Sequence, residues 1–274
     1  MDKNKYLTKK ATILKIKRVN PSTKLYTIKL DDSLWQKKFV FLPGQFVLVS
    51  LPGFGEAPFA ICSSPFEKNH FDLCIRNVGT LTGALDSLKE KAKIEIRGPL
   101  GNGFPIKEME NKDIVLIAGG TGIAPITSMV EHILKQRDKF QKVYFLYGAK
   151  TPKDLLFSDR FRKLQKEIDI CLIVQNPDKN WKKERGLVNK LCKKIDVDSK
   201  NTICLMCGPS IMYPALYKDL KKLKIAPENI YVSMERRMRC GLGKCQHCSF
   251  GKYYVCLNGP IFQYSKIKGM PEWI

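Results

Sequence analysis

Four cysteines near the end of the chain constrain its fold more than any other sequence feature. They are spaced C-x4-C-x2-C-x7-C in the stretch RCGLGKCQHCSFGKYYVC, as Cys240, Cys245, Cys248 and Cys256. The first three have the C-x4-C-x2-C spacing of a loop that wraps around a [2Fe-2S] cluster. Three glycines of this stretch suit a backbone that bends tightly and points amide hydrogens at sulfur, namely Gly241, Gly243 and Gly251. We therefore expect the four cysteines to be cluster ligands.

A structural zinc ion bound by four thiolates is the alternative for this segment. Zinc sites of this kind favour two C-x2-C pairs, and the segment holds only the pair Cys245 and Cys248. The spacing therefore favours iron and sulfur over zinc. His247 lies within the loop, but four cysteines already complete a ligand set, so we interpret it as a surface residue.

The size of the chain predicts two compact domains with a small appendage. It has 274 residues, 44% of them hydrophobic, which is long for a single domain and enough to bury a sizeable core. No run approaches the roughly 18 apolar residues of a membrane span, and the start, MDKNKYLTKK, lacks the apolar region of a signal peptide. We expect a cytoplasmic protein whose ten cysteines stay reduced and serve as metal ligands or core residues.

Residues 1–105 have the pattern of an antiparallel β-barrel. Short alternating or β-branched stretches are separated by turns, and the only helix expected there lies between Leu81 and Lys91. The stretches are ATILKIKRV from Ala11, KLYTIKL from Lys24, QFVLVSL from Gln45, FDLCIR from Phe71 and KIEIRG from Lys93.

Residues 106–234 have a different pattern, in which apolar strands alternate with helical periods such as the one near Ile126 to Arg137. Strands that are buried on both faces and separated by helices indicate a parallel, doubly wound sheet. The expected strands are DIVLIAGG from Asp113, KVYFLYG from Lys142, IDICLIVQ from Ile168, NTICLMCG from Asn201 and NIYVSME from Asn229. Neither periodicity persists beyond Glu235, so residues 235–274 form the metal-organised appendage.

Two glycine-rich turns predict a dinucleotide site in this sheet. The run AGGTGIAP follows the strand DIVLIA and opens a helix, where a diphosphate can approach the backbone at Gly119, Gly120, Thr121 and Gly122. The second turn, CGPSIM, also lies between an apolar strand and a helix, and includes Cys207, Gly208 and Pro209. Cys207, at the strand end, is the candidate catalytic residue facing a nicotinamide ring. We expect Cys204, inside the strand, to be a core residue.

The order of these parts resembles the ferredoxin-NADP reductase superfamily. A barrel, GNGF, AGGTGIAP, CGP and a terminal C-x4-C-x2-C-x7-C are similar to the branch that includes the electron-transfer subunit of dihydroorotate dehydrogenase. The stretches SMERRMRCGLGKCQHC and YVCLNGPIFQY look like the NAD(P)H-oxidising subunits of anaerobic sulfite reductase and of cytoplasmic sulfhydrogenase, in which it is the gamma subunit. The resemblance covers nearly the whole chain.

The resemblance implies that FAD binds in the barrel. The isoalloxazine would lie along EAPFAI, and IRNVGTLT would hold the ribityl chain and diphosphate, with Arg76 as the cationic partner. Relatives usually have a small hydroxyl residue where Ala60 stands, so a backbone amide or Ser63 would have to supply that hydrogen bond, and the flavin potential stays open. The implied flavin residues are Pro58, Phe59, Ala60, Ile61, Ile75, Arg76, Gly79, Leu81 and Thr82.

The resemblance also implies that hydride passes from NAD(P)H to FAD and that single electrons pass through the [2Fe-2S] cluster to a catalytic partner subunit. Flavin connects a two-electron donor to a one-electron acceptor, and the protein mainly positions the cofactors. The first expectation for the partner is a siroheme sulfite reductase subunit, and the alternative is a nickel-iron hydrogenase subunit. The choice between NADH and NADPH stays open, since Lys150 and Lys153 are equally consistent with a 2′-phosphate contact and with ordinary surface lysines.

The strong basic charge leaves a rival interpretation open. The chain has 48 Lys and Arg against 26 Asp and Glu, a net charge of +22 that attracts acidic proteins or nucleic acid. A zinc-stabilised nucleic-acid-binding protein would explain this charge and the cysteines, but not the two glycine turns or the barrel. A redox sensor would need an output module that the sequence lacks. We expect the basic residues of the last segment to form part of a docking face for an acidic partner near the cluster.

Overall fold

A computed structural model describes residues 6–270 as two compact units. The first unit comprises Met1–Gly103 as far as it is described, with Thr127–His132 and Glu235–Pro260. The second comprises Phe104–Ile126, Ile133–Met234 and the described part of Ile261–Ile274. The cysteine segment therefore belongs with the N-terminal unit, whereas the chain after Pro260 belongs with the second.

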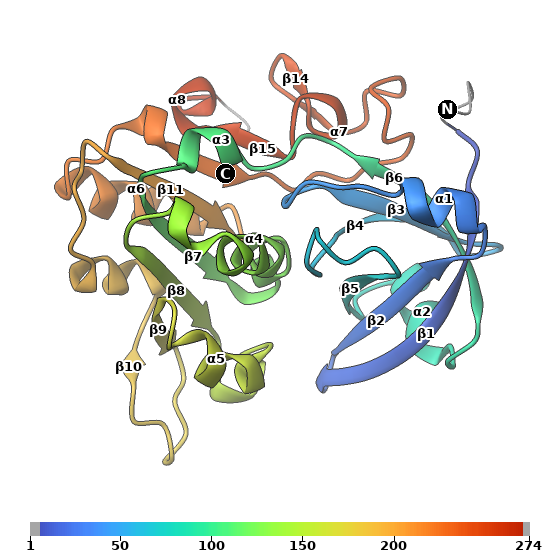
Figure 1. Cartoon of the computed structure of the whole chain (residues 1–274), viewed down its shortest axis with the longest axis horizontal. Helices are drawn as coiled ribbons and strands as arrows, with labels where there is room; N and C mark the ends of the chain where they lie inside the picture. Colours follow the sequence, from blue (N-terminus) through green and yellow to red (C-terminus); the bar gives the residue numbers. More distant parts are fainter. Residues whose placement is uncertain (1–5, 271–274) are drawn as a thin grey trace. The chain divides into compact units, whose positions relative to one another are not determined.

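The first unit is built on a six-stranded antiparallel sheet that closes into a barrel (Figure 1). The strands lie in the order β4-β3-β6-β1-β2-β5, and an isolated bridge between Ile61 and Leu73 joins the two edges. Alternate residues such as Val47 and Val49 face a buried core. The predicted barrel is confirmed, with strands β1 (Lys9–Asn20), β2 (Thr23–Leu30), β3 (Phe46–Leu51), β4 (Gly55–Ala60), β5 (Phe71–Arg76) and β6 (Lys93–Leu100).

Two helices complete the barrel. Helix α2 (Thr80–Ser87) is shorter than the helix expected from 81 to 91. Helix α1 (Ser33–Lys38) was not predicted, although Asp32 is a favourable N-cap whose carboxylate accepts the backbone N–H groups of Leu34 and Trp35. Strand β4 was also not predicted, because EAPFA carries a proline and no clear alternation.

The second unit contains a seven-stranded sheet in the order β10-β9-β8-β7-β11-β12-β15. All pairings are parallel except that of the edge strand β15, which is antiparallel to β12. The predicted parallel sheet is confirmed. Its strands are β7 (Asp113–Gly119), β8 (Val143–Ala149), β9 (Asp169–Val174), β10 (Glu184–Arg185), β11 (Thr202–Cys207), β12 (Ile230–Ser233) and β15 (Ile261–Gln263).

The helices of the second unit fall largely in the connections between these strands. Helix α4 (Ile123–Lys135) starts three residues before the expected position near Ile126, directly after the first glycine turn. The other helices are α3 (Ile106–Met109), α5 (Ser158–Leu164), α6 (Met212–Lys222) and α8 (Tyr264–Ile267), and 3-10 turns include η1 (Gly120–Gly122) and η4 (Val188–Lys194). Among residues 6–270, no helix has the length and apolar character needed to cross a membrane.

The cysteine segment has little regular structure. It contains the short hairpin of β13 (Ser249–Phe250) and β14 (Tyr253–Tyr254), followed by α7 (Val255–Asn258). After Pro260 the chain enters β15, whose first residue, Ile261, pairs with Ser233 at the end of β12. The range 235–274 that we expected to form one appendage is thus divided between the two units after Pro260.

Replacing Gln36 with leucine should destabilise the barrel. Buried Gln36 accepts the backbone N–H of Leu30 at 2.7 Å and donates to the carbonyl of Lys68 at 3.0 Å, so the change leaves both backbone groups unpaired. We expect a loss of about 2 kcal/mol in unfolding free energy, measured by urea denaturation. Lys37→Leu on the same helix is the control, and equal stability of the two variants would contradict this role.

Candidate functional site

The cysteine loop points backbone N–H groups at its sulfur atoms. The Sγ of Cys240 accepts hydrogen bonds from the amides of Leu242, Lys244 and Cys245 at 3.3–3.4 Å. The Sγ of Cys256 accepts the amide of Gly243 at 3.1 Å, and that of Cys248 accepts the amide of Cys256 at 3.5 Å. Positive φ angles at Gly241, Gly243, Gln246 and Gly251 produce these bends. Such hydrogen bonds to thiolate sulfur are typical of iron-sulfur loops.

The thiols of the loop differ in acidity. Partial burial acts to raise the pKa of Cys240, but the amides of Cys245, Leu242 and Lys244 outweigh it and lower the pKa to about 7. Burial raises the pKa of Cys256 to about 12, and the neighbouring Cys248 thiol adds to the shift. Iron binds the thiolate form, so the loop already favours it at Cys240, whereas at Cys256 the metal itself must displace the proton.

The four cysteines lie in one loop but do not surround a single point. Cys245 is exposed, Cys240 is half-buried, and Cys248 and Cys256 are buried. Within residues 6–270, no group of three or more His, Cys, Asp or Glu side chains is arranged to hold one metal ion. This spread fits a two-iron cluster better than the tight tetrahedron of a zinc thiolate site. His247 is exposed, as expected of a surface residue.

Arg97 of β6 joins this loop to the barrel. Its guanidinium donates to both carboxylate oxygens of Glu56 in β4, at 2.5 and 3.2 Å, and to the carbonyl oxygen of Cys240 at 2.7 Å. The Arg97 side chain is only 7% exposed, so water competes little for these bonds. A carbonyl of the cysteine loop and the strand expected to border the flavin are thus held by one side chain.

Apolar packing and a second set of hydrogen bonds also hold the loop. At Gly241, a Cβ would lie 2.6 Å from Leu48 Cδ1, so the loop backbone packs directly on the outer face of β3. Asn102 donates from its backbone to Gly259 O at 2.7 Å and from its side chain to Asn258 O at 3.2 Å. No sequence signal indicates these contacts, because Arg97 and Asn102 lie far from the loop in the chain.

The strand expected to border the flavin ring is incompletely covered by protein. Pro58, Phe59 and Ala60 of β4 are all half-buried although β4 pairs along its length with β3, whereas Ile61, the next residue, is fully buried. A flat ring lying on such a partly apolar strand would cover this surface. Ser63 is buried and accepts the backbone N–H of Asp72 at 3.0 Å, which ties its hydroxyl to β5.

The turn from β5 to α2 has the character of a diphosphate site. Ile75 is buried, Arg76 ends the strand with an exposed side chain, and the chain stays exposed to the helix start at Thr80. Thr82 Oγ1 accepts the N–H groups of Val78 and Gly79 at 2.9 and 2.8 Å, which fixes the turn. Buried Leu81 anchors α2 to the core. Positive charge and a helix start at one exposed turn fit an anionic group.

The two glycine turns of the second unit meet at the ends of β7 and β11, which are adjacent strands. A Cβ at Gly122 would lie 2.4 Å from Cys207 O, and one at Gly119 would lie 2.7 Å from Met212 Sδ. Gly208 adopts a φ of +159° and lies against the same methionine. Gly120, with a φ of +55°, has nothing within 4 Å of its Cβ position. The turns are therefore tightly packed below and open above, as a dinucleotide requires.

Residues outside both motifs hold these turns. The Tyr147 hydroxyl of β8 donates to Gly120 O at 3.2 Å, and the Tyr213 hydroxyl donates to Ser233 O at 2.6 Å while accepting the Gly208 N–H at 3.2 Å. Cys204 is fully buried, as predicted for a core residue. The Cys207 side chain is also buried, and its role toward nicotinamide stays a prediction. Lys150 and Lys153 are exposed and do not decide between NADH and NADPH.

Comparison with known families assigns each part of the chain. Residues 10–104 match the oxidoreductase FAD-binding domain, residues 116–218 match the oxidoreductase NAD-binding domain, and residues 235–268 match the iron-sulfur cluster binding domain of dihydroorotate dehydrogenase B. Sulfhydrogenase 1 subunit gamma of Pyrococcus furiosus is 37% identical and aligns over 98% of this chain and 94% of its own length. The chain belongs to this family of flavin- and nicotinamide-dependent electron-transfer subunits. It binds FAD and NAD and carries an iron-sulfur domain.

Other members of the family extend this relationship. Sulfhydrogenase 2 subunit gamma of P. furiosus is 38% identical over 95% of this chain and 96% of its own length. A probable dihydroorotate dehydrogenase B (NAD(+)) electron transfer subunit of Methanocaldococcus jannaschii is 33% identical over 96% and 94%. Among solved structures, an NADH-dependent reduced ferredoxin-NADP oxidoreductase has a TM-score of 0.74 at 23% identity, covering 93% of this chain and 90% of its own, which shows the common fold.

Replacing Arg97 with methionine should loosen the cysteine loop. The carboxylate of Glu56 loses its cation and Cys240 O loses its donor, at a cost of about 3 kcal/mol for a largely buried pair. We expect a lower melting temperature and faster iron loss during anaerobic dialysis, followed by visible absorption and iron assay. The double variant Glu56→Gln, Arg97→Met removes the unpaired charge and should recover part of the stability but not the iron retention. Unchanged iron retention in Arg97→Met would contradict this role.

Replacing Gly122 with alanine should prevent nucleotide binding while leaving the flavin in place. The new methyl group meets the Cys207 carbonyl and must push the two turns apart. We expect the Kd for NADH or NADPH to rise at least about tenfold, equivalent to about 1.4 kcal/mol, by calorimetry on the flavin-loaded protein.

Gly120→Ala is the matched control for this change. It adds the same methyl group in the same turn, but into open space, and its cost is limited to the strain of a left-handed φ, about 1–2 kcal/mol in stability. If both variants bind the nucleotide equally, close packing of the turns is not what the site requires.

Proposed function

We propose that this chain oxidises NAD(P)H through FAD and passes electrons one at a time through a [2Fe-2S] cluster to a catalytic partner subunit. The observation that carries the proposal is the cysteine loop, whose amides point at Cys240 and Cys256 sulfur while Arg97 ties it to the barrel. FAD-binding and NAD-binding domains in the same chain supply the donor side. Flavin is the chemical link between hydride transfer and single-electron transfer.

The protein's own residues position the cofactors in this proposal. On the flavin side, β4 presents a half-buried apolar strand and the β5–α2 turn presents a cation and a helix start. On the nucleotide side, the packed glycine turns admit the diphosphate to the backbone, and Cys207 borders the nicotinamide. The residues assigned to FAD are Pro58, Phe59, Ala60, Ile61, Ile75, Arg76, Gly79, Leu81 and Thr82; those assigned to NAD(P) are Gly119, Gly120, Thr121, Gly122, Cys207, Gly208 and Pro209; and those assigned to the cluster are Cys240, Cys245, Cys248 and Cys256.

For the partner, we propose the catalytic subunit of a cytoplasmic hydrogenase of the sulfhydrogenase type. Two sulfhydrogenase gamma subunits are 37% and 38% identical to this chain and align over almost all of it. From the sequence we expected a sulfite reductase subunit first, and none of the relatives described above has that name. The dihydroorotate dehydrogenase subunits are 31–33% identical and most align over a smaller share of the chain.

The first test is a visible spectrum of the anaerobically purified chain before and after NADH or NADPH. We expect flavin and iron-sulfur absorption that bleaches with at least one nucleotide, a content of two irons and one FAD per chain, and a low-temperature EPR signal from the reduced cluster. A colourless protein that contains zinc and cannot be reconstituted would overturn the proposal and favour the nucleic-acid-binding alternative.

Replacing a cluster cysteine should separate the two halves of the reaction. Cys248→Ser is expected to retain NAD(P)H-dependent reduction of ferricyanide, which takes electrons from the flavin, but to lose the EPR signal and at least about 90% of electron transfer to the partner. Cys171→Ser in β9 lies outside the loop and should behave as wild type. Full transfer to the partner by Cys248→Ser would exclude the cluster from the route.

A further inference from the structure

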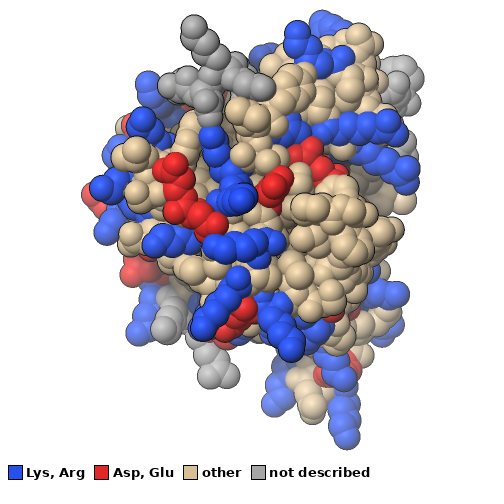
Figure 2. All heavy atoms as spheres, turned by 90° about the vertical axis from the view of Figure 1, so that its right-hand side faces the viewer, with Lys and Arg blue, Asp and Glu red and all other residues tan. Residues whose placement is uncertain are grey.

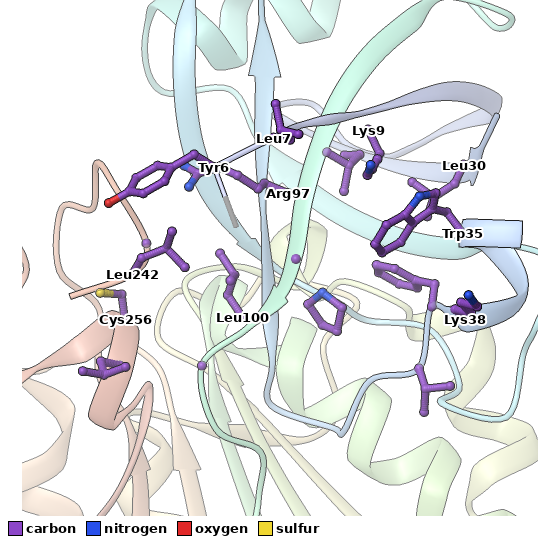
Figure 3. A pocket seen from close by; sticks show the side chains of 18 of the residues that line it. Tyr6, Leu7, Lys9, Leu30, Trp35, Lys38, Arg97, Leu100, Leu242 and Cys256 are labelled. Atoms are coloured by element: carbon purple, nitrogen blue, oxygen red, sulfur yellow. The ribbon is translucent and has the colours of Figure 1, made fainter. Parts of the chain in front are cut away.

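A large groove runs along the barrel beside the cysteine loop, entirely within the first unit. Its volume is about 1030 Å³, at the upper end of the range of small-molecule pockets. Figure 3 shows Leu242 and Cys256 at one end, and Trp35 and Lys38 of α1 at the other. The groove thus extends from a cluster ligand to the helix that the sequence did not predict.

The walls of this groove expose apolar side chains to solvent. Tyr6, Leu7, Val40 and Leu257 line it and are 51–59% exposed. Trp35 is half-buried, and the ammonium of Lys9 lies 4.2 Å from its ring centre. Exposed apolar residues that gather along one groove are typical of an interaction surface.

The charge of the groove has one sign. Lys9, Lys38, Arg97 and Lys244 line it, and no Asp or Glu is among its lining residues. Glu56 neutralises Arg97, which leaves three lysines facing the groove without a carboxylate in its lining. Lysine and arginine side chains also spread widely over the face of the molecule in Figure 2, whereas acidic side chains gather in fewer places. The groove therefore favours an acidic occupant.

We propose that this groove receives an acidic, partly apolar segment of the catalytic partner subunit. The inference rests on the proposed function and adds the docking position and the chemistry of the partner. Cys256 lines the groove, so a segment lying in it brings the partner next to a cluster ligand, and electron transfer requires such close approach.

Other occupants fit the groove less well. A second copy of this chain would bring another net charge of +22 against the three lysines. A nucleic acid would satisfy the lysines but would not need the aliphatic walls formed by Leu7, Val40 and Leu257. An acidic protein segment with apolar side chains matches both properties of the lining.

The test compares two double variants of the same helix region. Lys38→Glu with Val40→Glu changes two residues that line the groove, whereas Lys37→Glu with Leu34→Glu makes the same changes at exposed residues that do not line it. Each full-length variant is produced together with its catalytic subunit, and the complex is purified and titrated with salt. Ferricyanide reduction and the EPR signal of the isolated chain are measured in parallel.

We expect the groove variant to bind the catalytic subunit at least about tenfold more weakly and to lose NAD(P)H-dependent partner reduction in proportion, while the control changes less than about twofold. A photoreactive residue at Val40 should cross-link to an acidic peptide of the catalytic subunit. Equal partner retention by both variants, cross-linking to a second copy, or a wild-type chain that purifies without any other subunit would overturn the inference. Failure of the proposed function is recognised separately, because the isolated wild-type chain would then show neither ferricyanide reduction nor the EPR signal.

Discussion

The ion pair between Arg97 and Glu56, extended to the carbonyl of Cys240, is the interaction on which the first unit depends for its redox geometry. A loop with so little regular structure has few backbone partners of its own, so its position must come from outside. Arg97 supplies that position because one planar guanidinium reaches β4 and the loop at once. Leu48 beneath Gly241 and Asn102 beneath Asn258 make the attachment rigid. The distance between flavin and cluster is thus set by barrel residues, independently of the iron.

The features that the sequence predicted share a local cause. Alternation in the first hundred residues, continuous apolar runs in the next part and fixed cysteine spacing are all written in neighbouring residues, and the barrel, the parallel sheet and the cysteine loop followed from them. Helix α4 was displaced by three residues because η1 continues from the glycine turn directly into the helix. The cysteine motif and the resemblance named the family, whereas the first choice of partner rested on resemblance alone and found less support than its alternative.

The features that the sequence did not predict depend on distant residues. Arg97 belongs to the predicted strand KIEIRG, but nothing near it in the chain indicates Cys240 as its partner. Tyr147 and Tyr213 fix the glycine turns from neighbouring elements, and Met212 packs between both turns. Helix α1 is too short for helical periodicity to be recognised, yet it forms one end of the groove. Such contacts follow from topology, which becomes visible only after the strands are paired.

The pairing of Ser233 with Ile261 has an evolutionary consequence. Because these residues are opposite each other in an antiparallel ladder, the segment between them leaves and rejoins the sheet at one place. Deleting it would require only a short turn to reconnect β12 to β15, and inserting it would leave the sheet register intact. A cluster-bearing module of this kind can be gained or lost as a single genetic event. A reductase ancestor without iron could therefore acquire a new electron outlet while its nucleotide sheet stayed unchanged.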